Sequence, residues 1–235
     1  DLLSYRQRRR SSLHTRLTLT SAGALIITGT IRFYITETYL DSVFAAEPPG
    51  RLLVLSFFHS VASRTAGFVV SAQFSQLAAA NALLLTVLMF IGASPASMGG
   101  GISTSSFAVL ILSLWSFARG RNEISAGRRI IPLEILFKAA AIVTGAAIMI
   151  AVVTWLLLLT QDNVTLIAAL VESVSAFSTC GFTLGLTPRL DLFGQLLIAG
   201  LMFFGRVGTL TLIVAIARPT VPAAVSYPEE RILIG

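Results

Sequence analysis

Side chains that carry most enzyme chemistry are scarce in this chain. Its 235 residues include one cysteine, two histidines and 11 acidic residues. The single cysteine, Cys180, permits no internal disulfide bond, and no aspartate is paired with a histidine as a nucleophilic triad requires. No glycine-rich phosphate loop follows a strand, and no residues have metal-ligand spacing. We therefore expect a protein that is not an enzyme.

Charge is also scarce. Charged residues make up 12% of the chain and hydrophobic residues 55%, and the mean hydropathy is +0.84. A soluble domain carries roughly 25% charged residues. The composition therefore predicts an integral membrane protein that lies in the lipid bilayer.

The charges that are present are unevenly distributed. Although the net charge is +6, the basic side chains gather beside long apolar segments, in two clusters that the positive-inside rule places in the cytoplasm: Arg6, Arg8, Arg9, Arg10 and Arg16, then Arg119, Arg121, Arg128, Arg129 and Lys138. This distribution argues against nucleic acid as a partner. Acidic residues fall in or near the segments placed outside, where they either concentrate cations or are solvated loop charges: Glu37, Asp41, Glu47, Asp162, Glu172 and Asp191.

Two short passages indicate an internal repeat. They read Ser63-Arg64-Thr65-Ala66-Gly67-Phe68 and Ser178-Thr179-Cys180-Gly181-Phe182, and their glycines are 114 positions apart. The later passages Met89–Gly92 and Met202–Gly205 are 113 positions apart. Two anchors at nearly one offset predict two copies of one structural unit.

Each copy reads as a helix, a short re-entrant helix with a turn, and a second helix. The predicted segments are 17–40, 52–62 and 74–92 with a continuation at 107–118, then 133–160, 166–177 and 190–217. The short segments cover about half of the hydrocarbon core, because a helix rises about 1.5 Å per residue. We expect an all-α membrane fold of two parallel helix–pore-loop–helix repeats, like a potassium channel. The predicted divisions are a basic cytoplasmic segment (1–16), the first repeat (17–118), a cytoplasmic linker (119–132), the second repeat (133–218) and a cytoplasmic tail (219–235).

The turns after the short helices are the candidate ion filter. A filter needs backbone carbonyls that point at a dehydrated cation, and glycine readily adopts the positive φ that such a turn demands. One Thr-x-Gly-Phe turn alone would favour a surface turn, but two at equivalent positions favour a filter. We expect Phe68 and Phe182 to pack behind the turns and Cys180 to be a small apolar filler. The predicted filter residues are Thr65, Ala66, Gly67, Phe68, Thr179, Cys180, Gly181 and Phe182.

A loose stretch of small residues, 93–106, interrupts the second helix of the first repeat. It lies about 24 Å down that helix, where irregular backbone must face water or protein. We interpret it as a gate loop, with a plain helix kink as the alternative, and place the gate at Gly99, Gly100, Gly101 and Ser103. Arg206 lies at the same depth, so we expect it to repel passing cations, to bond the carbonyls of the glycine run, or to do both. For His59 we expect hydrogen bonds to the pore scaffold.

Together these passages resemble the membrane subunit of the Trk/Ktr/HKT potassium transporters, most closely the bacterial Ktr type. The matching segments are 12–17, 63–68, 88–106, 174–186, 202–211 and 227–235. That family has four repeats around a pseudo-fourfold pore, so the resemblance implies that this chain is the C-terminal half, with repeats three and four. It also implies one filter glycine per repeat (Gly67, Gly181), a gate loop at 93–106 and the last-helix arginine at Arg206. Members often have a lysine where Ser103 stands here.

The resemblance implies a function and partners. The function is uptake of K⁺, coupled to Na⁺ or not, across the cell membrane, with both termini in the cytoplasm and no covalently bound cofactor. The implied partners are the missing two N-terminal repeats or a split-gene equivalent, a second copy in a homodimer, and a cytosolic nucleotide-binding ring. The alternative function is a non-conducting membrane subunit or assembly partner that lacks its N-terminal half.

Overall fold

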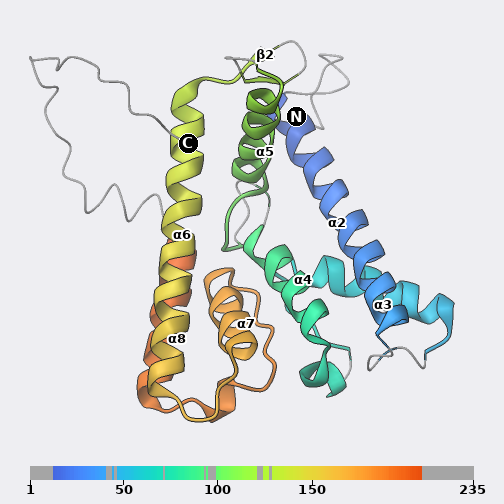
Figure 1. Ribbon diagram of the computed structural model, residues 1–235, viewed down its shortest axis with the longest axis vertical. Coiled ribbons are helices and arrows are strands. Elements are labelled where there is room, and N and C mark those ends of the chain that lie inside the picture. The colour runs from blue at the N-terminus through green and yellow to red at the C-terminus, as the bar shows by residue number, and fades with distance from the viewer. Residues whose placement is uncertain are drawn as a thin grey trace, which may run out of the picture.

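The computed structural model describes residues 13–207, except 41–43, 45–46, 71, 93, 95–98, 121–123 and 127–128. Its helices are α2 (Leu13–Tyr39), α3 (Pro49–Ala62), α4 (Ala79–Phe90), α5 (Thr104–Ala118), α6 (Leu133–Thr160), α7 (Leu166–Phe177) and α8 (Leu192–Val207), with 3₁₀ turns η1 (Ala72–Gln76) and η2 (Thr187–Arg189) (Figure 1). Several predicted features lie outside the described residues: Arg6, Arg8, Arg9, Arg10, Asp41, Arg121, Arg128, the gate-loop residues 93 and 95–98, the end of the last helix to 217, and the tail 219–235.

Within the described residues, two helices are long and apolar enough to cross a bilayer by length and composition, α2 from Thr15 and the whole of α6. The 28 residues of α6 extend about 42 Å, more than the hydrocarbon core. The side chains of Ile148, Val152 and Trp155 on α6 are exposed in the isolated chain. Exposed large apolar side chains on a helix of this length are what a lipid-facing surface requires.

The two short helices, α3 and α7, have the predicted half-membrane length. α7 begins and ends at the predicted residues, and the Thr165 hydroxyl caps it by accepting a hydrogen bond from the Ala168 N–H at 3.3 Å. α3 begins three residues earlier than predicted, since Pro49 stands at its first position, where a missing N–H costs nothing. α7 packs against α4, α6 and α8 and lies between them (Figure 1), so it is the central element of the second repeat.

The segment predicted as a helix at 74–92 is helical over α4 only and is followed by a non-helical loop, and its predicted start was wrong. It begins at Ala79 rather than Phe74, because Phe74 lies in the 3₁₀ turn η1 and its ring is buried against other aromatic rings. After Phe90 the chain leaves the helix and returns at Ile102, whose N–H donates to the Phe90 carbonyl oxygen at 3.1 Å. In Figure 1, α5 leads from this loop away from α4 toward the end where α6 starts.

The all-α prediction needs one small correction in the linker. Strands β1 (Ser125–Ala126) and β2 (Arg129–Ile130) pair antiparallel. The hairpin is held because Ile124 and Ile131 beside it are buried in a cluster with Val109 of α5 and Ala139 of α6. This small apolar cluster fixes the hairpin against α5 and α6.

Candidate functional site

The two predicted filter turns share one backbone pattern. The φ angles of Thr65 and Gly67 are 74° and 65°, and those of Thr179 and Gly181 are 54° and 99°. The residue between each pair, Ala66 or Cys180, does not have positive φ. Positive φ is unusual for a β-branched residue and costs on the order of 1–3 kcal/mol. The same unusual pattern at two equivalent places therefore indicates a specific role for both loops.

Each turn is tied to the end of its short helix. The N–H groups of Ala66 and Gly67 donate to the Ala62 carbonyl oxygen at 3.1 and 2.9 Å. The Cys180 N–H donates to the Ser175 carbonyl oxygen at 2.9 Å, and the Gly181 N–H donates to the Ser175 hydroxyl at 3.1 Å. These bonds fix the turns through their N–H groups.

The carbonyl groups of the turns are uncommitted. In the described part of the chain, none of these carbonyl oxygens accepts a hydrogen bond: Thr65, Ala66, Gly67, Thr179, Cys180 and Gly181. Both turns also follow helix C-termini, where the helix dipole places partial negative charge. Free carbonyls at the negative ends of two helices form an environment that favours a cation.

The two turns lie against each other. A Cβ added to Gly67 would overlap the carbonyl oxygen of Cys180, whereas one added to Gly181 would meet nothing within 4 Å. The Cys180 thiol is buried and lies 3.4 Å from the Ser63 carbonyl oxygen. Cys180 is thus a hydrogen-bonding contact between the repeats as well as the small filler that we expected.

The two filter phenylalanines differ. Phe182 is buried and stacks on Phe74 with a centroid distance of 4.9 Å. Phe68 is 70% exposed, so the expectation that it packs behind its turn was wrong for the described chain. Phe74, from the following 3₁₀ turn, is the ring that stacks on Phe182, and Val69 and Val70 beside Phe68 are exposed as well.

His59 was also predicted incorrectly. It is fully buried, and neither ring nitrogen has a hydrogen-bond partner in the described residues. Instead it lies in an aromatic cage, defined here as four phenyl rings whose centroids are 5.3–5.7 Å from the imidazole: Phe33, Phe44, Phe58 and Phe74. Phe74 also stacks on Phe182, so the aromatic cage contacts the second predicted filter turn through ring packing rather than through hydrogen bonds.

The predicted gate residues meet the end of α7. The Gly100 N–H donates to the Thr179 hydroxyl at 2.9 Å, and a Cβ on Gly100 would lie 2.7 Å from the Phe177 carbonyl oxygen. Gly101 has a φ of 81°, and Gly99 and Ser103 are half-buried. Ser103 caps α5, since its hydroxyl accepts from the Ser106 N–H at 3.3 Å.

Arg206 lies close to this point on α8. The preceding residue, Gly205, packs so tightly on the Phe177 carbonyl that an added Cβ would overlap it. The Arg206 side chain is exposed and makes no hydrogen bond or ion pair with the described residues. The predicted alternative, a bond from Arg206 to the carbonyls of the glycine run, is therefore absent within the described chain.

Sequence reasoning missed a role for Arg64. Its guanidinium donates to the carbonyl oxygens of Ala22 in α2 and Gly92 at the end of α4, both at 3.3 Å. The available signal was its charge, since an arginine placed after an apolar half-membrane helix needs partners at that depth. Its partners are backbone carbonyls of the first repeat.

The predicted acidic rim is largely engaged in structural contacts. Glu37 is buried and accepts hydrogen bonds from the Asn81 side chain and the Phe44 N–H. Glu172 is buried and accepts from the hydroxyls of Thr183 and Thr187. Neither carboxylate is a free surface charge, because hydrogen bonds from nearby donors compensate the cost of burying each one.

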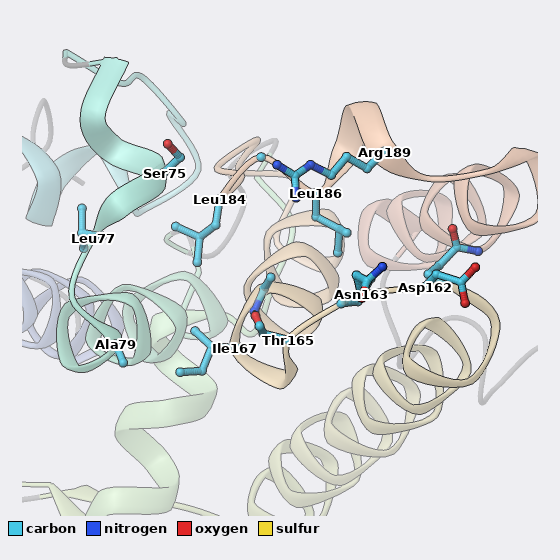
Figure 2. Close-up of a pocket in the computed structure, with 14 residues that line it drawn as sticks. Ser75, Leu77, Ala79, Asp162, Asn163, Thr165, Ile167, Leu184, Leu186 and Arg189 are labelled. Atoms are coloured by element: carbon cyan, nitrogen blue, oxygen red, sulfur yellow. The ribbon is translucent and has the colours of Figure 1, made fainter.

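A cavity of about 550 Å³ is lined by residues 75–79, by the start of α7 with the loop before it, and by residues 184–189, which follow the second predicted filter turn. Figure 2 shows Ser75 and Leu77 on one side of the cavity and Asn163 and Asp162 on the other, with Leu184 and Leu186 between them. No filter or gate residue lines it.

Comparison with known proteins assigns the family. The family model described as "TrkH: Cation transport protein" matches residues 12–223, so the chain belongs to this family of cation transport proteins. The membership confirms the predicted Trk/Ktr resemblance.

Among the curated relatives, Ktr system potassium uptake protein D of Bacillus subtilis is 36% identical over all of this chain and 51% of its own length. Ktr system potassium uptake protein B of Vibrio alginolyticus is 34% identical over 95% of this chain and 48% of its own length. The chain thus spans about half the length of the curated relatives it matches. Both relatives are named as uptake proteins, in agreement with the prediction that this chain is not an enzyme.

The fold has a solved counterpart. The potassium transporter TrkH from Vibrio parahaemolyticus superimposes with a TM-score of 0.68 and 20% identity, over 87% of this chain and 44% of that chain. This similarity supports the helical fold described above.

Proposed function

We propose that the chain forms half of a K⁺ pathway across the cell membrane. The turns Thr65–Phe68 and Thr179–Phe182 supply backbone carbonyls that replace the hydration shell of the ion. The observation that carries the proposal is the φ pattern repeated in both turns, together with their uncommitted carbonyls. The names of the relatives as potassium uptake proteins support the same ion.

The gate in this proposal is the loop below the filter, with Gly99, Gly100, Gly101 and Ser103. The contact of Gly100 with the C-terminal end of α7 supports the assignment, because the second proposed filter turn follows directly after that end. Arg206 would add an electrostatic barrier to cations leaving the filter, since a like charge at membrane depth repels them.

The membrane topology follows the predicted divisions. We propose repeats at 17–118 and 133–218, a cytoplasmic linker at 119–132, and cytoplasmic termini at 1–16 and 219–235. Figure 1 supports this arrangement, because the N-terminal end of α2, the linker hairpin and the start of α6 lie at one end of the molecule.

A complete pore needs further repeats in this proposal. Gly67 faces the neighbouring turn at Cys180, whereas the space beside Gly181 is open. In a ring of four turns, the open side of Gly181 would receive a turn from two N-terminal repeats, in the same polypeptide or a separate one. A homodimer and a cytosolic nucleotide-binding ring complete the proposed assembly.

The test is Rb⁺ uptake into proteoliposomes by the natural protein that contains these residues. Gly181→Ser should abolish uptake or change the ratio of Rb⁺ to Na⁺ flux, because a side chain strains the positive φ of the filter turn. Gly185→Ser is the matched control, since Gly185 also has positive φ and open space around it but lies outside the filter. Equal uptake and selectivity in wild type and Gly181→Ser would refute the filter.

Dependence of Rb⁺ uptake on a Na⁺ gradient distinguishes coupled transport from simple conduction.

The second candidate is a non-conducting membrane subunit or assembly partner. The open space beside Gly181 favours it, because the two turns alone leave that side without carbonyl ligands for an ion. Absence of Rb⁺ flux from well-folded protein, together with co-purification of a two-repeat membrane partner, would support this function instead.

A further inference from the structure

We infer that a groove between α5 and α6 binds one anionic phospholipid, with the lipid phosphate at Lys138 and one acyl chain in the groove. The groove has a volume of about 270 Å³, and no predicted filter residue lines it. The inference rests on the proposed topology, which puts the start of α6 at the cytoplasmic face, and it does not depend on ion conduction.

The wall of the groove is mainly apolar. Helices α2, α5 and α6 and the linker contribute its apolar residues, which are Leu17, Val109, Ile131, Ile135, Ala139 and Ile142. Ser105 and Ser106 also line it, and their hydroxyls are hydrogen-bonded to the Ser103 hydroxyl at 3.1 and 2.9 Å. Because these hydroxyls already have a partner, the wall favours a hydrocarbon chain over a polar ligand.

The groove runs in the direction of a lipid chain. Ile135, Ala139 and Ile142 are four and then three residues apart, so they lie on one face of α6 and extend about 10 Å along it. Figure 1 shows α5 beside the first part of α6, and the two helices pack on each other. Since α6 is long enough to cross the bilayer, a groove along it follows the membrane normal.

Lys138 lies at the depth of a lipid phosphate. The hydrocarbon core is about 30 Å thick and α6 is about 42 Å long, so about 6 Å of a centred helix projects at each end. Lys138 follows Leu133, the first residue of α6, by about 7.5 Å, which is the boundary of the hydrocarbon core. Ile142 lies about 6 Å deeper, among the acyl chains.

The charge at the mouth of the groove matches an anionic headgroup. Lys138 is exposed, and it makes no hydrogen bond or ion pair with the described residues. Glu134 in the same helix and Arg16 in α2 are both exposed, and their opposite charges cancel. Arg128 and Arg129 stand in the linker that leads to α6. A basic pocket between helices at the cytoplasmic side is where anionic lipid headgroups bind.

The first test is native mass spectrometry of the natural protein that contains this chain, titrated with phosphatidylglycerol or with phosphatidylcholine. Wild type should bind one phosphatidylglycerol molecule more tightly than any phosphatidylcholine. Lys138→Gln should weaken that binding about fivefold, the factor that one basic side chain contributes near an anionic headgroup. Lys138→Arg should preserve it.

Arg119→Gln is the matched control, because it removes a positive charge at the linker end of α5. The Arg119 guanidinium lies 4.6 Å from the centroid of the Trp115 ring and does not line the groove. No preference for phosphatidylglycerol, or equal weakening in Lys138→Gln and Arg119→Gln, would overturn the inference. Displacement of the lipid by inorganic phosphate would also overturn it, because the acyl chain would then contribute nothing.

Amine labelling tests the place of binding. Lys138 is the only lysine in this chain, so an amine-reactive reagent reports on it directly in the peptide that contains it. Labelling of wild type should be slower in phosphatidylglycerol nanodiscs than in phosphatidylcholine nanodiscs. Leu17→Trp narrows the groove from α2 and should restore fast labelling in phosphatidylglycerol.

Equal labelling of wild type in the two lipids would overturn the inference, and a groove filled by another segment of the protein would give that result. Neither measurement uses ion flux. Loss of Rb⁺ uptake would therefore refute the proposed function and leave the lipid site standing, whereas loss of lipid selectivity would do the reverse.

Discussion

The carbonyl oxygen of Cys180 occupies the space that a Cβ on Gly67 would need. The two proposed filter turns therefore pack directly on each other, although 114 positions separate their glycines. Two features disfavour a side chain at position 67, the φ of 65° and this contact. At position 181 only the φ of 99° does so. This difference between equivalent glycines makes the first prediction.

Gly67→Ala should destabilise the protein more than Gly181→Ala. The positive φ costs each alanine roughly 1–2 kcal/mol, but Gly67→Ala also forces the backbone of Cys180 away. Thermal unfolding in detergent should show a clearly larger fall in midpoint for Gly67→Ala. Equal shifts for the two variants would contradict the packing of one turn on the other.

His59→Phe should leave the unfolding midpoint unchanged or raise it. The imidazole is fully buried with two unpartnered nitrogens, and replacing unsatisfied polar atoms by apolar ones removes a desolvation penalty of about 1–3 kcal/mol. His59→Ala should lower the midpoint, because it leaves a cavity among the rings of the aromatic cage. A large fall in the midpoint of His59→Phe would show that the imidazole makes a polar contact after all.

Glu172→Ala should loosen the segment that follows the second filter turn. The Glu172 carboxylate accepts from Thr183 and Thr187, so its removal leaves two hydroxyls without this partner, at about 1–3 kcal/mol. Limited proteolysis should then cut within residues 183–190 faster than in wild type. The control is Glu134→Ala, since Glu134 is exposed in the first turn of α6. Equal cleavage of wild type and Glu172→Ala would contradict the bracing role.

Asp191 should make the start of α8 sensitive to acid. It precedes the helix, and the N–H of Gly194 at 2.7 Å, with the Gln161 amide at 2.6 Å, holds the pKa of its carboxyl below the ordinary value. A lowered pKa in the folded state stabilises at pH above the ordinary value, and that stabilisation is lost as pH falls through the folded pKa. Amide exchange in the first turn of α8, corrected for the intrinsic pH dependence, should rise at acid pH in wild type but not in Asp191→Asn. A flat profile in wild type would contradict this prediction.

Sequence reasoning predicted the helical plan well, because apolar length and breaks carry that information. The bounds of α6 and α7 agree with the predicted 133–160 and 166–177. The start of α4 was misplaced because Phe74 is apolar and continues the hydrophobic run toward the helix. Only the structure shows that Phe74 lies in a 3₁₀ turn, with its ring stacked on Phe182. The linker hairpin was missed because two-residue strands leave no period in a sequence.

The site was predicted at the level of segments rather than contacts. The repeat pointed to Gly67 and Gly181, but it gave no reason to distinguish the two threonines, which differ only through Gly100. Burial of Glu37 and Glu172 depends on donors distant in sequence or in the next loop, so charge alone suggested either a rim that concentrates cations or solvated loop charges. The exposure of Phe68 and the burial of Phe182 were likewise not predictable, because the two residues share one motif.

The most direct measurement is the position of Rb⁺ in a structure of the natural protein that contains this chain, located by anomalous scattering. The account predicts an Rb⁺ peak within coordination distance of the carbonyl oxygens of Thr65 and Thr179, and loss of that peak in Gly181→Ser but not in Gly185→Ser. The absence of any Rb⁺ peak between the two turns at saturating Rb⁺ would contradict the central claim that they form an ion filter.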